Sequence, residues 1–365
     1  MVIVSVNPLV AYGIVGYDAN ALYPSVMRDG KFPDPLRIRR YSPSLNTIRQ
    51  LIDHDNLVCA ADIDIRKPEG VMGMLAGKDD AGRKDWTVSE FSGWMCEPEI
   101  RLALEIGYEI TNVREVMGAQ ACNPFRDFVE EMYALRMQMR EDGDPAHSMV
   151  KLAMNSLFGR FAIKEKPTRI EGSEGILKAQ ESNGWPDRYE IRFHDGHEQY
   201  QYLLDMDSLT RAPSSQYFGF SSFILSYGRE RLMRAILAAG DGFLYSDTDS
   251  VYMLEEYREQ FESQVSIGDE LGQWKLETPE PIFKGTFWEP KCYFFENEEG
   301  EKVLVKHKGV SVRGDDGEYL DNAGDLTKPQ RHKTIVSLYE ALRRGLDVGI
   351  PMITEKKSAR YYQEP

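Results

Sequence analysis

The sequence predicts a chain that contains both helices and antiparallel strands, and two local patterns carry this prediction. Residues 123–163 have the capping residues and apolar spacing of a helical pair. β-Rich runs on both sides of residues 247–249 predict a hairpin. At about 150 residues per domain, 365 residues suggest two or three substructures. A composition of 42% hydrophobic and 28% charged residues is typical of globular proteins and excludes a disordered, collagen-like or coiled-coil chain.

The net charge limits the partners that the protein can bind. Its 44 basic and 59 acidic residues give a charge of −15, which argues against coating nucleic acid or membrane by bulk positive charge. Any polyanion must therefore bind in a local basic cleft. No apolar run approaches the roughly 18 residues that a bilayer span requires. Because the first residues also lack the basic region of a signal peptide, the sequence predicts a cytoplasmic protein with no membrane partner.

The helices are predicted from their ends and from apolar periodicity. Asn123 can cap the first helix, Pro124 suits its first position and Gly143 can end it. Its apolar stripe consists of Phe125, Phe128, Val129, Met132, Leu135 and Met139. Good helix formers predict a second helix over 146–163, and a third helical pattern covers 220–239. The third helix is expected to carry an exposed charged face of Arg229, Arg231 and Arg234.

Two polar stretches are predicted to be insertions outside the core. Residues 66–87 mix glycines with charges, as a long loop or hairpin does. Residues 164–212 contain alternating patches that predict short antiparallel strands.

Three carboxylates are candidates for a metal site. Asp18 ends the strand-like run 12–17, and Asp247 and Asp249 lie at the predicted hairpin bend. Oxygen-only ligands suit hard cations such as Mg²⁺ or Mn²⁺. Two such ions can activate an attacking oxygen and stabilise a leaving oxygen in phosphoryl transfer. Taken alone, two acids at a turn are more often a solvated loop, so the metal site needs support from other residues.

That support comes from a second set of residues on the helical pair. One face of the second helix carries, at i, i+4, i+7 and i+11, the residues Lys151, Asn155, Phe158 and Ala162. Arg136 and Arg140 are spaced i, i+4 on the first helix, so three cations can converge on phosphates. Gly159 leaves a spot without a side chain, where a flat base pair could approach. The alternative is an ordinary charged surface helix.

Three segments together resemble a known family. Residues 18–25 (Asp-Ala-Asn-Ala-Leu-Tyr-Pro-Ser), 151–159 (Lys-Leu-Ala-Met-Asn-Ser-Leu-Phe-Gly) and 245–250 (Tyr-Ser-Asp-Thr-Asp-Ser) resemble, in that order, motifs A, B and C of family B DNA polymerases. Residues 290–293 are similar to the Lys-x-Tyr element that contacts primer and template, and 306–309 to the basic element near the palm and thumb junction. The spacing of the motifs is most similar to the protein-primed bacteriophage branch.

The resemblance implies roles for individual residues. Asp18 and Asp249 would be the principal ligands of two Mg²⁺ ions, or Mn²⁺, with Asp247 as a supporting ligand. Tyr23 would be the steric gate that rejects a 2′-hydroxyl. The implied nucleotide-binding residues are Tyr23, Arg136, Arg140, Lys151, Asn155 and Phe158. The implied DNA-binding residues are Gly159, Thr248, Lys291, Tyr293, Lys306 and Lys308.

The fold that the resemblance implies is an α+β right hand with an antiparallel palm, helical fingers, inserted subdomains and a small thumb. Its expected parts are the palm with motif A at 1–30, an insertion resembling the first terminal-protein region at 31–122, the fingers with motif B at 123–163, a second insertion forming a template-encircling loop at 164–212, the palm with motif C at 213–305 and the thumb at 306–365.

The implied function is DNA-directed addition of dNMPs to the 3′ end of a primed DNA template, with dNTPs as substrates. Only 17 residues precede Asp18, whereas the family's exonuclease domain lies upstream of motif A, so we expect no exonuclease in this chain. A separate exonuclease or a priming protein would then be a partner, and a truncated chain is the other explanation. Motif B usually carries Tyr where this chain has Phe158. Two alternatives stay open: a non-catalytic DNA-binding subunit, and a primase or translesion polymerase. A viral protein of this kind would act in the cytoplasm of a bacterial host.

Overall fold

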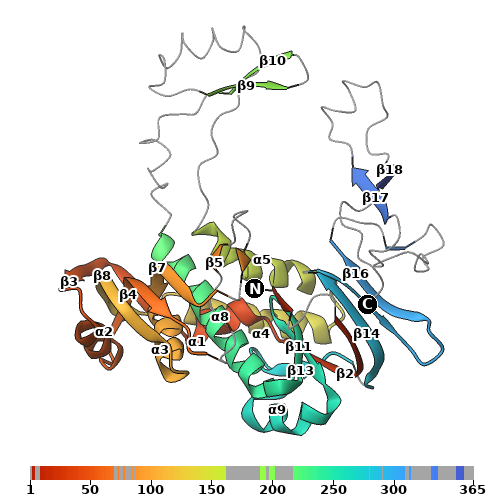
Figure 1. Ribbon diagram of the computed structural model, residues 1–365, viewed down its shortest axis with the longest axis horizontal. Coiled ribbons are helices and arrows are strands. Elements are labelled where there is room, and N and C mark those ends of the chain that lie inside the picture. The colour runs from red at the N-terminus through yellow and green to blue at the C-terminus, as the bar shows by residue number, and fades with distance from the viewer. Residues whose placement is uncertain are drawn as a thin grey trace.

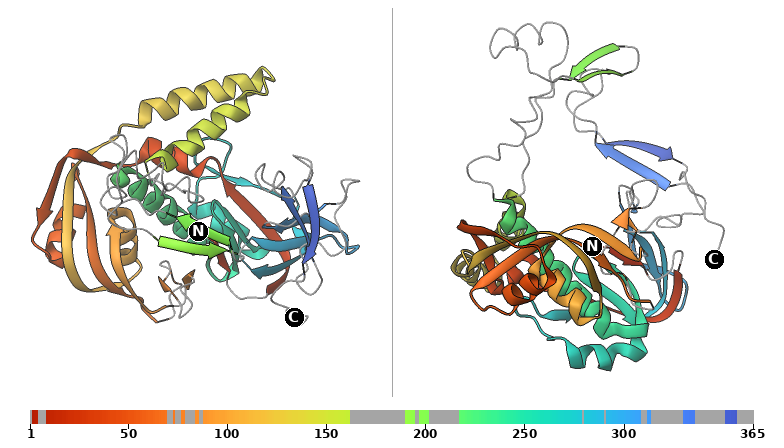
Figure 2. Two further views of the ribbon diagram at one scale, coloured as in Figure 1. Left: turned by 90° about the horizontal axis from the view of Figure 1, so that it is seen from above. Right: turned by 60° about the vertical axis from the view of Figure 1, so that its left-hand side comes forward.

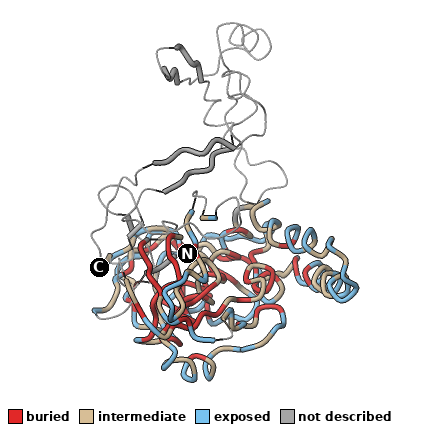
Figure 3. Tube along the Cα trace, turned by 90° about the vertical axis from the view of Figure 1, so that its right-hand side faces the viewer, coloured by how far each residue is buried: buried red, intermediate tan, exposed pale blue. Residues whose placement is uncertain are grey.

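The computed structural model forms one main body with a large antiparallel sheet at one end and a smaller sheet at the other (Figure 1). It describes residues 2–4, 9–69, 73, 77–78, 84–85, 88–161, 190–194, 197–201, 217–278, 280–289, 291–308, 312–313, 330–335 and 351–356. Buried residues gather in the middle of this body (Figure 3). None of the helices within those ranges is both long enough and apolar enough to cross a membrane.

The large sheet is antiparallel throughout and is built around one long strand. Its order is β1 (Val2–Val4), β11 (Phe243–Asp247), β12 (Ser250–Leu254), β2 (Leu9–Ala19), β14 (Ile282–Glu289), β15 (Cys292–Glu296) and β16 (Lys302–His307). Strand β13 (Trp274–Leu276) also pairs with β2, so β2 has three partner strands. Fully buried rings and aliphatic chains line this sheet: Ile14, Tyr17, Tyr245, Tyr252, Phe287 and Phe295. The predicted strand at 12–17 and the hairpin around 247–249 are confirmed.

The smaller sheet has the order β3 (Phe32–Tyr41), β8 (Glu109–Cys122), β4 (Leu57–Arg66) and β7 (Glu90–Cys96). Two helices pack on it, α2 (Leu45–Ile52) and α3 (Glu97–Glu105). The long helix α8 (Phe218–Ala239), predicted at 220–239, lies between the two sheets in Figure 1. One continuous core joins Ile63 and Ile100 of the smaller sheet layer, Ile236 of α8 and Met253 of the large sheet. The two sheets therefore share a core through α8.

Several short elements complete the described chain. After α8 come two 3₁₀ turns and a helix: η1 (Gly240–Gly242), η2 (Glu255–Tyr257) and α9 (Arg258–Gln264). Three small hairpins are β5 (Gly77–Lys78) with β6 (Lys84–Asp85), β9 (Glu190–His194) with β10 (His197–Gln201), and β17 (Gln330–Ile335) with β18 (Pro351–Lys356). The antiparallel strands predicted within 164–212 are confirmed by β9 and β10. The rest of that stretch, and most of 70–87, lie outside the described residues.

The predicted helical pair is present as α4 (Arg126–Glu141) and α5 (His147–Arg160), which lie side by side and project from the body (Figure 2). The first helix begins two residues later than predicted, at Arg126 rather than Pro124, but Asn123 still caps it. Its side-chain oxygen accepts hydrogen bonds from the backbone amides of Phe125 and Arg126, both at 3.0 Å. Gly143 adopts φ 71° directly after the helix.

The apolar stripe of α4 is only partly buried. Val129 is the one buried residue within α4 and Met154 the one within α5, whereas Phe128 and Leu135 are about 40% exposed, at 39% and 41%. The stripe stays accessible because the pair packs against the body at its base alone. Little core therefore holds the far end of these helices.

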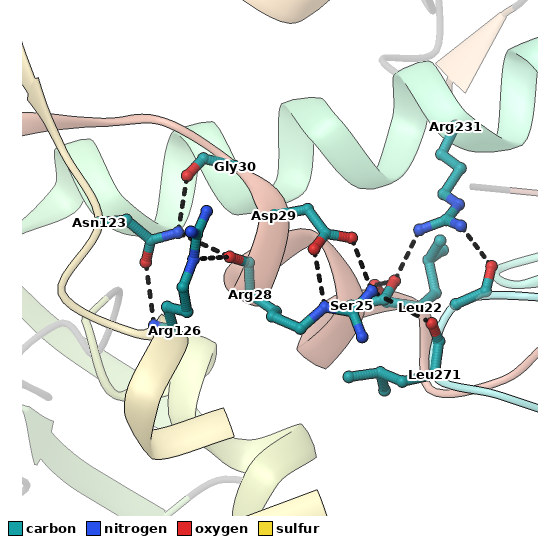
Figure 4. Close-up of polar contacts among 10 residues, drawn as sticks. Leu22, Ser25, Arg28, Asp29, Gly30, Asn123, Arg126, Arg231 and Leu271 are labelled. Atoms are coloured by element: carbon teal, nitrogen blue, oxygen red, sulfur yellow. Dashed lines mark hydrogen bonds and ion pairs between the residues drawn. The ribbon is translucent and has the colours of Figure 1, made fainter. Parts of the chain in front are cut away.

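A polar network holds α1 (Leu22–Asp29) against its neighbours (Figure 4). The side-chain nitrogen of Asn123 donates to the backbone oxygens of Arg28 and Gly30, at 2.8 and 2.9 Å. On the other side of α1, Arg231 of α8 donates to Ser25 Oγ at 2.9 Å and to the carbonyl oxygen of Gly272. The expected exposed arginine face of α8 is thus wrong for Arg231, because nearby backbone and hydroxyl oxygens draw its guanidinium inward.

We expect Asn123→Ala to lower the free energy of unfolding by about 2 kcal/mol. The change removes a helix cap, whose loss typically costs about 1 kcal/mol, and two further hydrogen bonds that tie α1 to α4. Chemical denaturation monitored by circular dichroism measures the loss. Asn112→Ala is the matched control, since Asn112 makes one exposed side-chain hydrogen bond to Asp64 at 3.0 Å. Equal losses in the two variants would contradict the role of Asn123.

Candidate active site

Strand pairing brings the three candidate acids to one edge of the large sheet. Asp18 of β2 lies opposite Ser250 of β12, and the backbone amide of Ala19 donates to the carbonyl oxygen of Asp249 at 2.8 Å. Asp247 ends β11. All three acids line one cleft of about 390 Å³, together with Ser250, Tyr252, Glu277, Lys291, Tyr293, Lys306, His307 and Lys308. Residues from motif A, motif C, the Lys-x-Tyr element and the basic element therefore meet in a single cleft.

The ionised forms of two of the acids, Asp18 and Asp249, are disfavoured by their surroundings. Burial is the main cause that raises the pKa of Asp18 to about 7, followed by the charges of Asp249 and Glu277, with Lys151 acting in the opposite direction. Burial and then the charge of Asp247 raise the pKa of Asp249. Ionised carboxylates here repel one another, so a cation in the cleft would be stabilised.

Asp247 differs from the other two acids because it already has a cationic partner. Its Oδ1 lies 2.5 Å from Lys291 Nζ and accepts a hydrogen bond from Thr248 Oγ1 at 3.0 Å. Both partners have left-handed backbones, with φ 66° at Thr248 and 62° at Lys291, which is uncommon outside glycine. The hydroxyl of Tyr245 accepts a hydrogen bond from the backbone amide of Lys291 at 2.9 Å, which holds that strained residue in place.

The donor set fits a hard divalent ion that completes its coordination from substrate. Within the described residues, no three His, Cys, Asp or Glu side chains are arranged to hold a metal ion by themselves. Mg²⁺ typically binds to one or two protein carboxylates and takes its remaining ligands from water and substrate phosphates. Asp18 and Asp249, half-buried in one cleft with the charge of Asp249 acting on Asp18, match that pattern.

The predicted nucleotide-binding residues divide into two groups. Lys151 of α5 is exposed and lies near enough to Asp18 and Asp249 for its charge to lower the pKa of both acids. The rings of Tyr23 and Phe158 lie against each other, with centroids 4.4 Å apart and planes inclined by 31°. A side chain at Gly159 would point into open space, as the prediction of a free surface beside Phe158 requires.

The other predicted nucleotide contacts lie on the same two helices, α4 and α5. Arg140 acts on the exposed Asp269, whose pKa is lowered first by Lys275 and also by Arg140. Arg136 contributes a buried Nε that has no hydrogen-bond partner among the described residues. Asn155 is half-buried on α5. Tyr23 and Phe158 therefore lie together and Lys151 acts on the acids, whereas the assignment of Arg136, Arg140 and Asn155 to the nucleotide stays a prediction.

Sequence reasoning missed two residues at this site. Glu277 lines the acid cleft and accepts a hydrogen bond from the Tyr252 hydroxyl at 2.6 Å. Arg229 lies close enough to Tyr23 to oppose the rise in the pKa of its hydroxyl, which burial and Asp249 cause. Neither residue belongs to a recognisable motif. Glu277 reaches the cleft only because β13 pairs with β2, a contact between distant parts of the chain.

Comparison with known proteins identifies the family. The model of DNA polymerase type B, organellar and viral, matches residues 2–204, which is more than half of the chain. The chain belongs to this family. The resemblance to family B DNA polymerases that motifs A, B and C carry is therefore confirmed, within a family of organellar and viral polymerases.

Relatives of this type B family chain come from fungi and from a bacteriophage. A probable DNA polymerase of Agaricus bitorquis is 25% identical to this chain, over 81% of this chain and 39% of its own length. A probable DNA polymerase of Ascobolus immersus is also 25% identical, over 81% of this chain and 24% of its own length. The chain thus spans well under half the length of these relatives. Phi29 DNA polymerase in complex with primer-template DNA and incoming nucleotide has a TM-score of 0.62 at 15% identity, covering 97% of this chain and 59% of that one. The orthorhombic crystal form has a TM-score of 0.58 at 16% identity, over 84% and 52%. These likenesses show an α+β polymerase fold.

Proposed function

We propose that this chain is a DNA-directed DNA polymerase that adds dNMPs to a primer 3′ end on a DNA template. The observation that carries the proposal is the pair of half-buried carboxylates, Asp18 and Asp249, which line one cleft and lie within reach of the charge of Lys151. Membership of the type B family supports it, and Phi29 DNA polymerase, whose fold this chain shares, has been solved with primer-template DNA and incoming nucleotide.

In this proposal Asp18 and Asp249 hold two Mg²⁺ ions, and Asp247 supports them. When bound, such ions neutralise phosphate charge and favour in-line attack of an oxygen on phosphorus. Lys151 binds the triphosphate of the dNTP by charge. Because the ring of Tyr23 lies beside Asp249, it forms the floor on which the sugar rests and blocks a 2′-hydroxyl. Positioning and charge neutralisation provide most of the catalysis in phosphoryl transfer.

The duplex would lie on the opposite side of the acids from the helical pair. Lys306 pairs with Tyr293 across β15 and β16, and the backbone amide of Lys308 donates to the carbonyl oxygen of Lys291 at 3.0 Å. We propose that these four residues hold the primer terminus and the duplex backbone. Lys291 would then exchange its partner Asp247 for a DNA phosphate, so DNA binding would free Asp247 to act on a metal ion.

The parts of a right hand follow from this placement. We propose that the large sheet is the palm and that α4 and α5 are the fingers. The smaller sheet at 31–122 and the segment 164–212 are the two insertions, and 306–365 the thumb. The helical pair then brings Lys151 over the edge of the palm that carries the acids.

A primer-extension assay tests the proposal. We expect the chain to lengthen a labelled DNA primer on a longer template with dNTPs and Mg²⁺, and to stop when EDTA removes the metal. Without metal or without template there should be no product. Binding of primer-template and dNTP with no extension under any of these conditions would contradict the proposal and favour a non-catalytic subunit. Starts without a primer would favour the primase alternative.

A further inference from the structure

The ring of Tyr23 is held between two elements. Phe158 of α5 lies against it, with ring centroids 4.4 Å apart. On α8, Gly228 approaches so closely that an added Cβ would lie 3.1 Å from Cε1 and 3.5 Å from Cδ1 of the Tyr23 ring. Such a contact is tighter than most Cβ contacts in proteins, so the backbone of α8 itself supports the ring. The position of α8 therefore decides where this ring can go.

The residue next to Gly228 anchors α8 at this point. Arg229 donates two hydrogen bonds to Glu99 of α3, from Nε to Oε1 at 2.6 Å and from Nη2 to Oε2 at 2.8 Å. Glu99 is only 4% exposed, and Arg229 is largely covered. A planar, two-point ion pair of this kind fixes direction as well as distance. It joins the smaller sheet unit to the helix that supports Tyr23.

We propose that Glu99 is a positioning residue for sugar selection: through Arg229 and the adjacent Gly228, it holds the ring of Tyr23 rigid against the sugar of the incoming nucleotide. The inference rests on the proposed function, because it concerns which nucleotides the same site accepts. It gives the smaller sheet unit a role in substrate choice, although that unit contributes no residue to the acid cleft.

Rejection of one hydroxyl group depends on how little the blocking ring yields. A ring that can shift by a few tenths of an ångström accepts a ribose with its 2′-hydroxyl, whereas a ring fixed on both sides excludes that hydroxyl by repulsion. A group that must be held this closely needs neighbours that are themselves fixed. Phe158 is itself tied to α8, because its carbonyl oxygen accepts a hydrogen bond from Ser221 Oγ at 2.7 Å, so the support on both sides of the ring depends on how firmly α8 is held. The ion pair with Glu99 holds α8 at this point.

The chain contains a matched control for this ion pair. Arg234, five residues farther along α8, makes an equivalent two-point pair with Glu105 of the same helix α3, at 3.0 and 2.8 Å. Both pairs join the same two helices, but only Arg229 adjoins the glycine that touches Tyr23. The Glu105 side chain is 54% exposed and that of Glu99 is 5% exposed, so losing the Glu99 pair costs more stability. The readout that separates positioning from stability is therefore the ratio of dNTP use to rNTP use.

The test measures kcat/KM for a dNTP and for the matching rNTP in single-nucleotide extension of a DNA primer. We expect Glu99→Gln to lower the preference for dNTP on the order of tenfold, mainly through better use of rNTP, since a misplacement of about 1 Å can change rates a hundredfold. Glu105→Gln should keep the wild-type preference. Gly228→Ala, which crowds the ring instead of loosening it, should raise KM for dNTP without lowering the preference. Thermal unfolding of each variant is recorded in parallel.

Equal effects of Glu99→Gln and Glu105→Gln, or no effect of either, would overturn the proposal. If Glu99→Gln does not fold, the Gly228→Ala variant tests the proposal instead. This variant is expected to fold because alanine favours the helix. An unchanged KM for dNTP would show that the position of the Tyr23 ring does not depend on α8. A wild-type chain that incorporates neither nucleotide would overturn the proposed function itself. If the wild-type chain extends the primer normally and the variants have no effect, only the role of Glu99 is overturned.

Discussion

Asp249→Ala is expected to slow nucleotide addition by a thousandfold or more, an increase of about 4 kcal/mol in the activation free energy. Among the described residues Asp249 lines the cleft without a salt bridge, whereas the neighbouring Asp247 is already paired with Lys291. Single-turnover primer extension with saturating dNTP and Mg²⁺ measures the rate. Extension within about tenfold of the wild-type rate would contradict the role of Asp249.

The same variant also separates catalysis from folding. Because burial and the charge of Asp247 disfavour ionised Asp249, its replacement should not lower the free energy of unfolding. Asp55→Ala, which removes an exposed acid from the loop before β4, is the control for a general change of charge. We expect normal extension from that variant. An inactive but fully stable Asp249→Ala protein would show that the acid serves the reaction.

Lys151→Ala is expected to lower kcat/KM for dNTPs on the order of a hundredfold, because it removes a cation whose charge acts on both Asp18 and Asp249. The loss should appear chiefly as a higher KM, since the side chain would bind the triphosphate in the ground state as well as in the transition state. Steady-state extension at varied dNTP concentration separates the two constants. Lys151→Arg, which keeps the charge, should recover part of the activity.

The control for Lys151 lies on the same helix. Arg160 is exposed in the last turn of α5, and Arg160→Ala should leave KM for dNTPs unchanged. If both variants raise KM equally, a general electrostatic effect of α5 would explain the result and the specific role of Lys151 would be wrong.

Much of this fold follows from local patterns in the chain. The hairpin that carries Asp247 and Asp249 is predicted by β-rich runs around a two-residue turn, and α4 by Asn123 and Gly143 at its ends. The convergence of Asp18 with the hairpin needed the family motifs, because the pairing of β2 with β12 is a long-range contact that no local pattern encodes.

The remaining features depend on tertiary packing. Arg229 and Arg231 resemble surface charges in the sequence, yet both are drawn inward by oxygen atoms on other elements. Glu99 follows strand β7 with no sign of its partner 130 residues away. Glu277 also has a partner that its local sequence does not indicate, since its carboxylate accepts a hydrogen bond from Tyr252 across the sheet. Such residues are selected by contacts that exist only after folding.

The two halves of the candidate site differ in stiffness. The acids stand on or beside β2, which three strands clamp at the centre of the large sheet, whereas Lys151 stands on a pair of helices with a single buried residue in each. The half of the site that carries the acids is thus the rigid half. Movement that admits a substrate and then closes the site around it therefore takes place in α4 and α5. These helices can move without disturbing the strands that carry the acids.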